Sequence, residues 1–186
     1  MTRRLNSKKL RTIDPEAAER LSRQIKRSDI YLVLEDVLDT YNIGGFFRLA
    51  DAIGAKKIYL CGATATPPNS KIRKAAVGTD KFLPWEYKET ALAAIADLRQ
   101  LPGLRVVAVE QCRASIDYRR FNYDLPLAFV FGNETYGLSK IAQKASDAVV
   151  EIPMYGINKS LNVMIAAGIV AYFALGRLRP ISPRGH

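Results

Sequence analysis

Cysteine and histidine are scarce in this sequence of 186 residues, which holds two cysteines and one histidine. Cys61 and Cys112 lie far apart and have no companion histidines, so the sequence predicts neither a disulfide framework nor a zinc site. We expect two reduced, buried thiols and no bound metal. The single histidine is His186, the last residue, so no histidine in the body of the chain is available as a general base.

Long hydrophobic runs are also absent. The longest apolar stretch, residues 163–175, contains Gly168 and is too short to span a bilayer comfortably. The N-terminus begins with Met1 and Thr2 and runs on polar, without the apolar segment of an ordinary secretory signal. We therefore expect a cytoplasmic protein that does not bind a membrane.

Acidic residues are in the minority, because 28 lysines and arginines stand against 18 aspartates and glutamates and give a formal net charge of +10. Clustered cations gain affinity for a polyanion by releasing counterions from its phosphates, so nucleic acid is the natural partner to consider. A basic surface that is merely solvated is the alternative on charge alone.

The N-terminal segment, residues 1–29, is especially rich in lysine and arginine. Asp14 and Pro15 are typical of a helix start, with the aspartate as N-cap and the proline at the first helical position. We expect a basic helix over residues 17–26 that either faces RNA or only meets solvent. A chain of this length is enough for one well-packed domain, which we place at residues 30–186.

Within residues 30–186, short apolar runs typical of buried strands alternate with helical segments. The predicted strands are 30–34, 57–61, 82–87, 105–109, 127–131 and 148–152, and the predicted helices are 43–53, 90–100, 138–145 and 160–178. Strands that are apolar on both faces predict a mostly parallel sheet with helices on both faces, an α/β fold. Residues 64–74 are expected to form an irregular, basic loop.

In such sheets, ligands bind beyond the carboxyl ends of the strands. The loops after Leu34, Val109, Phe131 and Ile152 are therefore where chemistry is expected. Three segments of the chain carry residues that are unusual for ordinary loops and helices.

The first segment is NIGGFFRLADAIGA, residues 42–55. Asn42 is predicted as N-cap and Gly54 as the C-terminal stop, with Arg48 opposite a face formed by Ile43, Phe46, Phe47, Ala50 and Ile53. Two glycines in the first turn cost helix stability, so we expect close approach by another backbone or by a ligand phosphate. The alternative is that Asn42 only caps and Arg48 only meets solvent.

The second segment is FGNETYGLS, residues 131–139, which directly follows a predicted buried strand. Gly132 would let a ligand lie against the main chain, and Asn133 and Glu134 supply an amide and a carboxylate at the ligand edge of the sheet. The alternative is a simple turn.

The third segment is IPMYGINKSLNV, residues 152–163. Ser160 is predicted to cap the long apolar helix, which puts Asn162 in its first turn, where free backbone N–H groups favour an anion. An ordinary strand, loop and capped helix is the alternative, and it leaves Asn162 unexplained.

The order and spacing of the three segments resemble the signature motifs of the SpoU, or TrmH-like, branch of the SPOUT RNA 2′-O-ribose methyltransferases. The resemblance implies an α/β sheet whose C-terminal part is threaded as a deep trefoil knot. It also implies S-adenosyl-L-methionine as cofactor, held largely by backbone groups of the loops after Val109, Phe131 and Ile152. The protein would be a homodimer, with the helix from Ser160 in the interface and each active site built from both subunits.

By motif position, the resemblance assigns the catalytic site to Asn42, Arg48, Glu134, Ser160 and Asn162. The cofactor contacts would be Gly132, Ile152 and Leu161, with Asn133 and Met154 beside them and Glu110 as a further candidate. The chain departs from the family pattern at Tyr41, where a proline is usual, and at Leu49, where a threonine is frequent, and either change could alter substrate access.

A guanidinium is a poor proton acceptor because its pKa is above ~12. We therefore expect Arg48 to act as a charge that lowers the pKa of the ribose hydroxyl and fixes the adjacent phosphate. Glu134 or a water would then take the proton.

Two other classes of protein compete with this interpretation. A catalytically silent RNA-binding or assembly protein could keep the fold, but the presence of all five assigned catalytic residues argues against it. A methyltransferase of the ordinary Rossmann type would need a glycine-rich turn after the first strand, which residues 34–39 lack.

The RNA is not fixed by the sequence. Because no separate RNA-binding domain precedes the catalytic one, we favour transfer RNA slightly over ribosomal RNA. Recognition would then fall to the basic N-terminal segment, the loop at residues 64–74, and Arg113, Arg119 and Arg120.

Overall fold

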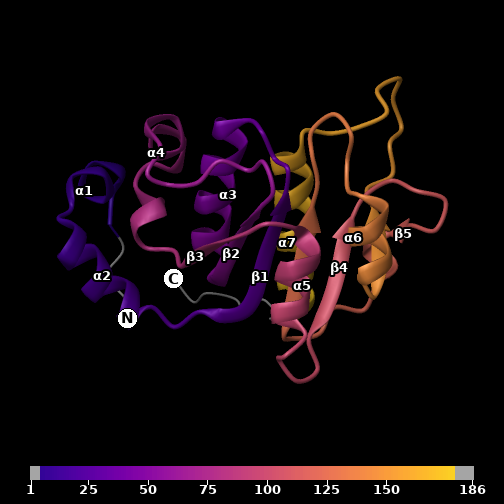
Figure 1. Ribbon diagram of the computed structural model, residues 1–186, viewed down its shortest axis with the longest axis horizontal. Helices are drawn as coiled ribbons and strands as arrows, with labels where there is room; N and C mark the ends of the chain where they lie inside the picture. The colour runs from indigo at the N-terminus through magenta and orange to yellow at the C-terminus, as the bar shows by residue number, and fades with distance from the viewer. Residues whose placement is uncertain (1–4, 179–186) are drawn as a thin grey trace, which may run out of the picture.

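The computed structural model describes residues 5–178, which form a twisted sheet between two layers of helices (Figure 1). The strands are β1 (Ser28–Glu35), β2 (Ala55–Cys61), β3 (Trp85–Lys88), β4 (Arg105–Val109), β5 (Ile116–Asp117), β6 (Leu127–Phe131) and β7 (Ala148–Glu151). They form one seven-stranded sheet in the order β3-β2-β1-β6-β4-β7-β5, and every neighbouring pair is parallel. The predicted α/β fold with a parallel sheet is confirmed, whereas the trefoil knot stays a prediction.

The helices are α1 (Ser7–Thr12), α2 (Pro15–Gln24), α3 (Thr40–Ile53), α4 (Ser70–Ala76), α5 (Ala91–Leu98), α6 (Lys140–Ala145) and α7 (Val163–Leu178), with two short 3-10 turns, η1 (Thr79–Lys81) and η2 (Tyr118–Arg120). The five predicted helices correspond to α2, α3, α5, α6 and α7. None of the helices in the described part of the chain is both long enough and apolar enough to cross a bilayer. His186 lies outside the described residues.

The sheet has a core on each face. In β1, Leu32 and Leu34 point towards α3 and α7, whereas Tyr31 and Val33 point towards α5 and α6. This alternation follows from the strand period of two residues, and burial on both faces explains why the strands read as continuous apolar runs.

The two thiols differ in exposure. Cys61 is buried, and this burial raises the pKa of its thiol to about 12, so that it stays protonated. Cys112 is only half-buried, so the expectation of two buried thiols was wrong for Cys112. It lies in the loop after β4.

The predicted irregular loop at residues 64–74 contains the start of α4, so that prediction was wrong over its second half. Asn69 caps the helix, because its Oδ1 accepts hydrogen bonds from the backbone N of Lys71 at 2.9 Å and of Ile72 at 3.2 Å. Ile72 and Ala76, four residues apart, are fully buried against α3. Tertiary burial therefore stabilises a helix that is too short to form alone.

The N-cap of α3 lies three residues earlier than predicted. Asp39 is the N-cap, since its carboxylate accepts a hydrogen bond from the backbone N of Tyr41 at 2.8 Å. The prediction of Asn42 as the cap was therefore wrong, and its side chain is available for other contacts. The C-terminal stop is confirmed, because Gly54 has a φ of +67° in the left-handed region.

Helix packing explains the two glycines of α3. A Cβ on Gly44 would lie 2.5 Å from the Cβ of Ala75 and 2.7 Å from the carbonyl oxygen of Ile72. A Cβ on Gly45 would lie 2.8 Å from the Cγ of Met164 in α7. The expected close approach is thus made by the backbone of α4 and by a side chain of α7, and no ligand phosphate is needed to explain it.

We expect Gly44→Ala to destabilise the protein by about 1–3 kcal/mol, because the new methyl group overlaps the backbone of α4. Gly176→Ala is the matched control, since it also lies in a helix, and among residues 5–178 no atom beyond its neighbours and its own helix backbone lies within 4 Å of its Cβ position. The control should gain up to about 1 kcal/mol from helix propensity. Urea unfolding measures both, and equal stability of the two variants would contradict the packing argument.

Candidate active site

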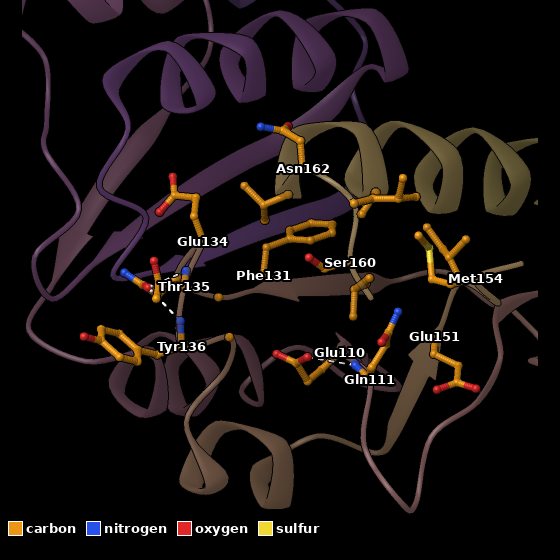
Figure 2. A pocket seen from close by; sticks show the side chains of 18 residues that line it. Glu110, Gln111, Phe131, Glu134, Thr135, Tyr136, Glu151, Met154, Ser160 and Asn162 are labelled. Carbon is orange, nitrogen blue, oxygen red and sulfur yellow. Dashed lines mark hydrogen bonds between the residues drawn. The ribbon is translucent and has the colours of Figure 1, made fainter. Parts of the chain in front are cut away.

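A pocket of about 290 Å³ lies at the carboxyl ends of β4, β6 and β7. Figure 2 shows its walls, which come from the loop after β4, the turn after β6, the segment after β7 and the start of α7. Of the four loops where chemistry was expected, those after Val109, Phe131 and Ile152 meet at this pocket, whereas the loop after Leu34 contributes no lining residue. Among the assigned site residues, the lining includes Glu110, Gly132, Asn133, Glu134, Ile152, Met154, Ser160, Leu161 and Asn162.

Asn133 holds the turn after β6 closed. Its backbone exchanges hydrogen bonds with that of Gly137 at 3.2 Å and 2.9 Å. Its Oδ1 accepts from the backbone N of Thr135 at 2.8 Å and of Tyr136 at 3.0 Å, and its Nδ2 donates to the carbonyl of Asp36 at 2.8 Å. The amide of Asn133 thus fixes both the turn and its position next to the loop after β1.

Gly132 is required by the turn itself. A Cβ at this position would lie 2.4 Å from the backbone carbon of Gly137 and 2.4 Å from the backbone N of Leu138. We expected this glycine to make room for a ligand against the main chain. The space at its Cβ position is instead filled by the backbone of the turn, so the reason given for the glycine was wrong. Gly132 still lines the pocket through its backbone.

Glu110 connects the loop after β4 to the turn after β6. One carboxylate oxygen accepts from the backbone N of Gln111 at 2.8 Å, and the other accepts from the backbone N of Leu138 at 2.7 Å. Two loops that are distant in sequence are thereby held together on one wall of the pocket.

A chain of hydrogen bonds connects the three sequence segments. The Nδ2 of Asn42 donates to Oε1 of Glu134 at 2.9 Å, and the Oδ1 of Asn42 accepts from the Nδ2 of Asn162 at 3.0 Å. Glu134 also accepts from the backbone N of Leu38 at 3.1 Å and of Asp39 at 3.1 Å. Asn42 is thus held on both sides and fixes the start of α3 to the start of α7.

The ionisation of Glu134 follows from these donors. Partial burial alone would raise the pKa of its carboxyl, but the donors, chiefly the amide of Asn42 and the backbone N of Leu38, hold that pKa below its usual value. The group is therefore ionised at neutral pH, and both of its oxygens already accept hydrogen bonds.

Asn162 is the cap of α7. Its Oδ1 accepts from the backbone N of Met164 at 2.9 Å and of Ile165 at 3.3 Å. The prediction that Ser160 caps this helix was wrong, because the helix begins at Val163, directly after Asn162. An anion was expected at this end because the first backbone N–H groups of a helix are free. The side chain of Asn162 satisfies two of these donors, so they no longer argue for an anion.

Arg48 lies apart from the pocket of its own chain. It is exposed on α3, six residues beyond Asn42, which corresponds to about 9 Å along the helix axis. It does not line the pocket, and no ion pair joins it to another residue between positions 5 and 178. The structure thus brings together all the assigned catalytic residues except Arg48.

The pocket is acidic although the whole chain is strongly basic. Its lining holds three carboxylates, Glu110, Glu134 and Glu151, and no lysine, arginine or histidine among the described residues. Glu151 was not predicted, although its position at the end of a buried strand could have suggested it, and its carboxylate accepts from the hydroxyl of Ser115 at 2.6 Å. Such a lining attracts a cationic ligand and repels a phosphate.

The sequence from residue 29 to residue 172 matches the SpoU rRNA Methylase family. The 23S rRNA (guanosine-2′-O-)-methyltransferase RlmB of Ralstonia nicotianae is 30% identical over 159 residues, covering 86% of this chain and 63% of that protein. The A. aeolicus TrmH/SpoU tRNA modifying enzyme superposes with a TM-score of 0.74 at 26% identity, covering 92% of this chain and 81% of that one. The SpoU methyltransferase AviRb from Streptomyces viridochromogenes, in complex with the cofactor AdoMet, superposes with a TM-score of 0.72 at 28% identity, covering 81% and 58%.

The family match includes all three segments singled out in the sequence and, apart from Ser28 at the start of β1, all seven strands of the sheet. The chain spans less than two thirds of the length of the rRNA-methylating relative, whereas it covers most of the A. aeolicus structure. Sequence and fold agree, and the chain belongs to the SpoU rRNA methylase family.

Proposed function

We propose that this chain transfers a methyl group from S-adenosylmethionine to a ribose 2′-hydroxyl of RNA. The observation that carries the proposal is the hydrogen-bonded chain from Glu134 through Asn42 to Asn162, which brings three distant segments to one acidic pocket. Family membership and the names of the relatives support the same activity.

The residues of the pocket fit S-adenosylmethionine. The donor carries a positively charged sulfur, which suits a lining with three carboxylates and no basic residue in the described part of the chain. Phe131, Ile152 and Leu161 supply apolar surface for the adenosine part, as is usual in small-molecule sites. When bound, the donor supplies an electrophilic methyl group on a sulfur that leaves as a neutral thioether.

The protein contributes position and charge to the reaction. The ribose oxygen must lie in line with the methyl carbon, and it must be partly deprotonated when the new C–O bond forms. Arg48 lowers the pKa of that hydroxyl and holds the adjacent phosphate. A water accepts the proton, because the three donors on Glu134 lower its pKa and make it a weaker base, and Glu134 serves to position Asn42.

Transfer RNA is the substrate that we favour, and the active form is a homodimer in the cytoplasm. The superposition on the A. aeolicus tRNA modifying enzyme supports the RNA class, because it covers 92% of this chain and 81% of that one. The position of Arg48 outside its own pocket supports a site completed by a second subunit. The exposed side chains of Ile165 and Tyr172 on α7 offer an apolar surface for the dimer.

The decisive experiment incubates the purified chain with methyl-tritiated S-adenosylmethionine and either bulk transfer RNA or ribosomal RNA. We expect label in transfer RNA, at linkages that resist alkaline hydrolysis because their 2′-oxygen is methylated. Donor binding without transfer to either RNA would favour the catalytically silent alternative. A chain that does not bind the donor would overturn the proposed activity. Sedimentation of the same sample tests the dimer.

We expect Leu161→Lys to weaken donor binding by at least about tenfold, because it places an ammonium among three carboxylates and competes with the sulfonium. Leu161 lines the pocket and is 37% exposed, so the substitution does not disturb the core. Leu161→Met is the control of similar size without charge. Calorimetric titration with S-adenosylmethionine compares the two, and equal affinities would count against an acidic donor site.

A further inference from the structure

Two short helices that are distant in sequence, α1 and α4, are joined through the segment that follows α4. A Cβ on Gly78 would lie 2.4 Å from the carbonyl oxygen of Leu10, so the two backbones are in direct contact. The Nζ of Lys81 donates to the carbonyl of Arg11 at 3.1 Å and of Ile13 at 3.0 Å. Figure 1 shows both helices at the same end of the molecule, on the side of β2 and β3.

Both helices carry basic side chains and no acidic ones. Each has three exposed cations, which are Lys8, Lys9 and Arg11 in α1 and Lys71, Arg73 and Lys74 in α4. Among residues 5–178, Arg73 alone of these six is in an ion pair, a long one of 3.9 Å to Asp80. We call these six residues the α1–α4 basic surface.

Helix α2 lies between them in the sequence but has a different charge balance. Arg20 pairs with Glu16 at 3.8 Å, and Arg23 pairs with Glu19 at 2.6 Å. The two arginines and two glutamates cancel, so α2 has no net charge. The helix for which the sequence left RNA contact or solvent exposure open is thus internally neutralised, whereas α1 and α4 are not.

We propose that the α1–α4 basic surface docks the phosphate backbone of the RNA substrate, an inference that rests on the proposed function. Like charges held on neighbouring helices repel one another, and a bound polyanion relieves that repulsion and releases its own counterions. The acidic pocket repels phosphates, so the RNA backbone must be held elsewhere on the protein. The surface lies next to α3, the helix that carries Asn42 and Arg48, because α4 packs against α3 at Gly44.

The test compares pairs of substitutions that remove the same charge from different helices. Lys8→Gln with Lys9→Gln changes α1, Lys71→Gln with Lys74→Gln changes α4, and Arg20→Gln with Arg23→Gln changes α2 as the control. Arg73 is left in place because it is the ion-pair partner of the largely buried Asp80. Binding of bulk transfer RNA is measured by fluorescence anisotropy over a range of salt concentrations.

We expect each lysine pair to weaken binding by about tenfold or more near 0.1 M salt and to reduce the slope of log K against log salt by about 1.5. The α2 control should change affinity by less than about threefold, since its arginines are already paired. Thermal unfolding and the affinity for S-adenosylmethionine should be unchanged in all three variants, because the substituted side chains are exposed and lie outside the pocket.

The possible results separate this inference from the proposed function. If the lysine pairs weaken binding no more than the α2 control, the basic surface is overturned while methyl transfer by the unsubstituted chain still stands. If the unsubstituted chain neither binds transfer RNA nor methylates it, the proposed function fails and this inference fails with it. Loss of binding by the lysine pairs, with an unchanged melting temperature, supports the inference.

Discussion

Replacing Arg48 by alanine is expected to reduce the maximal rate of methyl transfer by about 10²–10³-fold, the usual effect of removing one preorganised charge from a transition state. Lysine at this position should keep measurable activity, because it restores the positive charge without the planar fork of donors. Arg48 is exposed and lies outside the pocket, so neither variant should lose stability or affinity for the donor.

Single-turnover rates with saturating S-adenosylmethionine measure this effect apart from donor binding. Equal and complete loss in both variants, with donor affinity intact, would show that the guanidinium does more than supply charge. Arginine donors that bind two oxygens of a phosphate at once would then be the better explanation.

A mixing experiment tests whether Arg48 acts across a dimer. In a heterodimer of Arg48→Ala and Leu161→Lys chains, one of the two shared sites has both native residues if Arg48 serves the pocket of its partner. An equal mixture would then recover roughly a quarter of the unsubstituted activity, because half of the dimers are mixed and each has one intact site. If Arg48 serves its own pocket, every site carries one substitution and the mixture stays inactive.

Periodicity made the scaffold predictable from the sequence. Ile43, Phe46 and Phe47 recur at helical spacing, and all three are fully buried in α3. The parallel sheet followed from strands that are apolar on both faces, and the position of the pocket followed from the rule that ligands bind at the carboxyl ends of such strands. These signals repeat over many residues, so the predicted fold did not depend on any single residue.

Helix starts were less predictable because several neighbouring side chains can cap equally well. Asp39, Thr40 and Asn42 all suit the N-terminus of α3, and the choice depends on Glu134, which is 92 residues further along the chain and binds Asn42. Helix α4 was missed for a similar reason. Its seven residues gain stability from the burial of Ile72 against α3, which no local pattern reveals.

The charge of the pocket was hidden because its three glutamates come from three segments that are distant in sequence. Glu110, Glu134 and Glu151 follow or end different strands, and each alone looks like an ordinary surface acid. Only their convergence shows that a basic protein has an acidic pocket. This contrast is the reason for proposing a cationic donor in the pocket and an anionic backbone on the α1–α4 basic surface.

Replacing Glu134 by glutamine is expected to lower both stability and activity. An amide has one acceptor oxygen in place of two, so its NH2 group would face at least one of the donors from Leu38, Asp39 and Asn42. We expect a loss of about 1 kcal/mol of unfolding free energy. We also expect a decrease of about 10–100-fold in the maximal rate, because a misplaced catalytic group is costly.

Asp147→Asn is the matched control. Asp147 also has a pKa held below its usual value, since donors outweigh its burial, and it accepts from the backbone N of Val106 and from Arg99. It lies before β7, at the end of the sheet opposite the pocket. The control should therefore lose comparable stability, and its activity when folded should be unchanged.

The pH dependence separates positioning from proton transfer. Because the folded pKa of Glu134 is lowered, its stabilisation is fully present above its ordinary value of 4.5 and is lost as the pH falls through the lower folded value. Glu134→Gln should remove that acid-dependent component of stability and leave the pH profile of the maximal rate unshifted. A variant whose rate has no plateau and instead rises steadily with hydroxide concentration would identify Glu134 as the proton acceptor, because hydroxide then replaces the missing base.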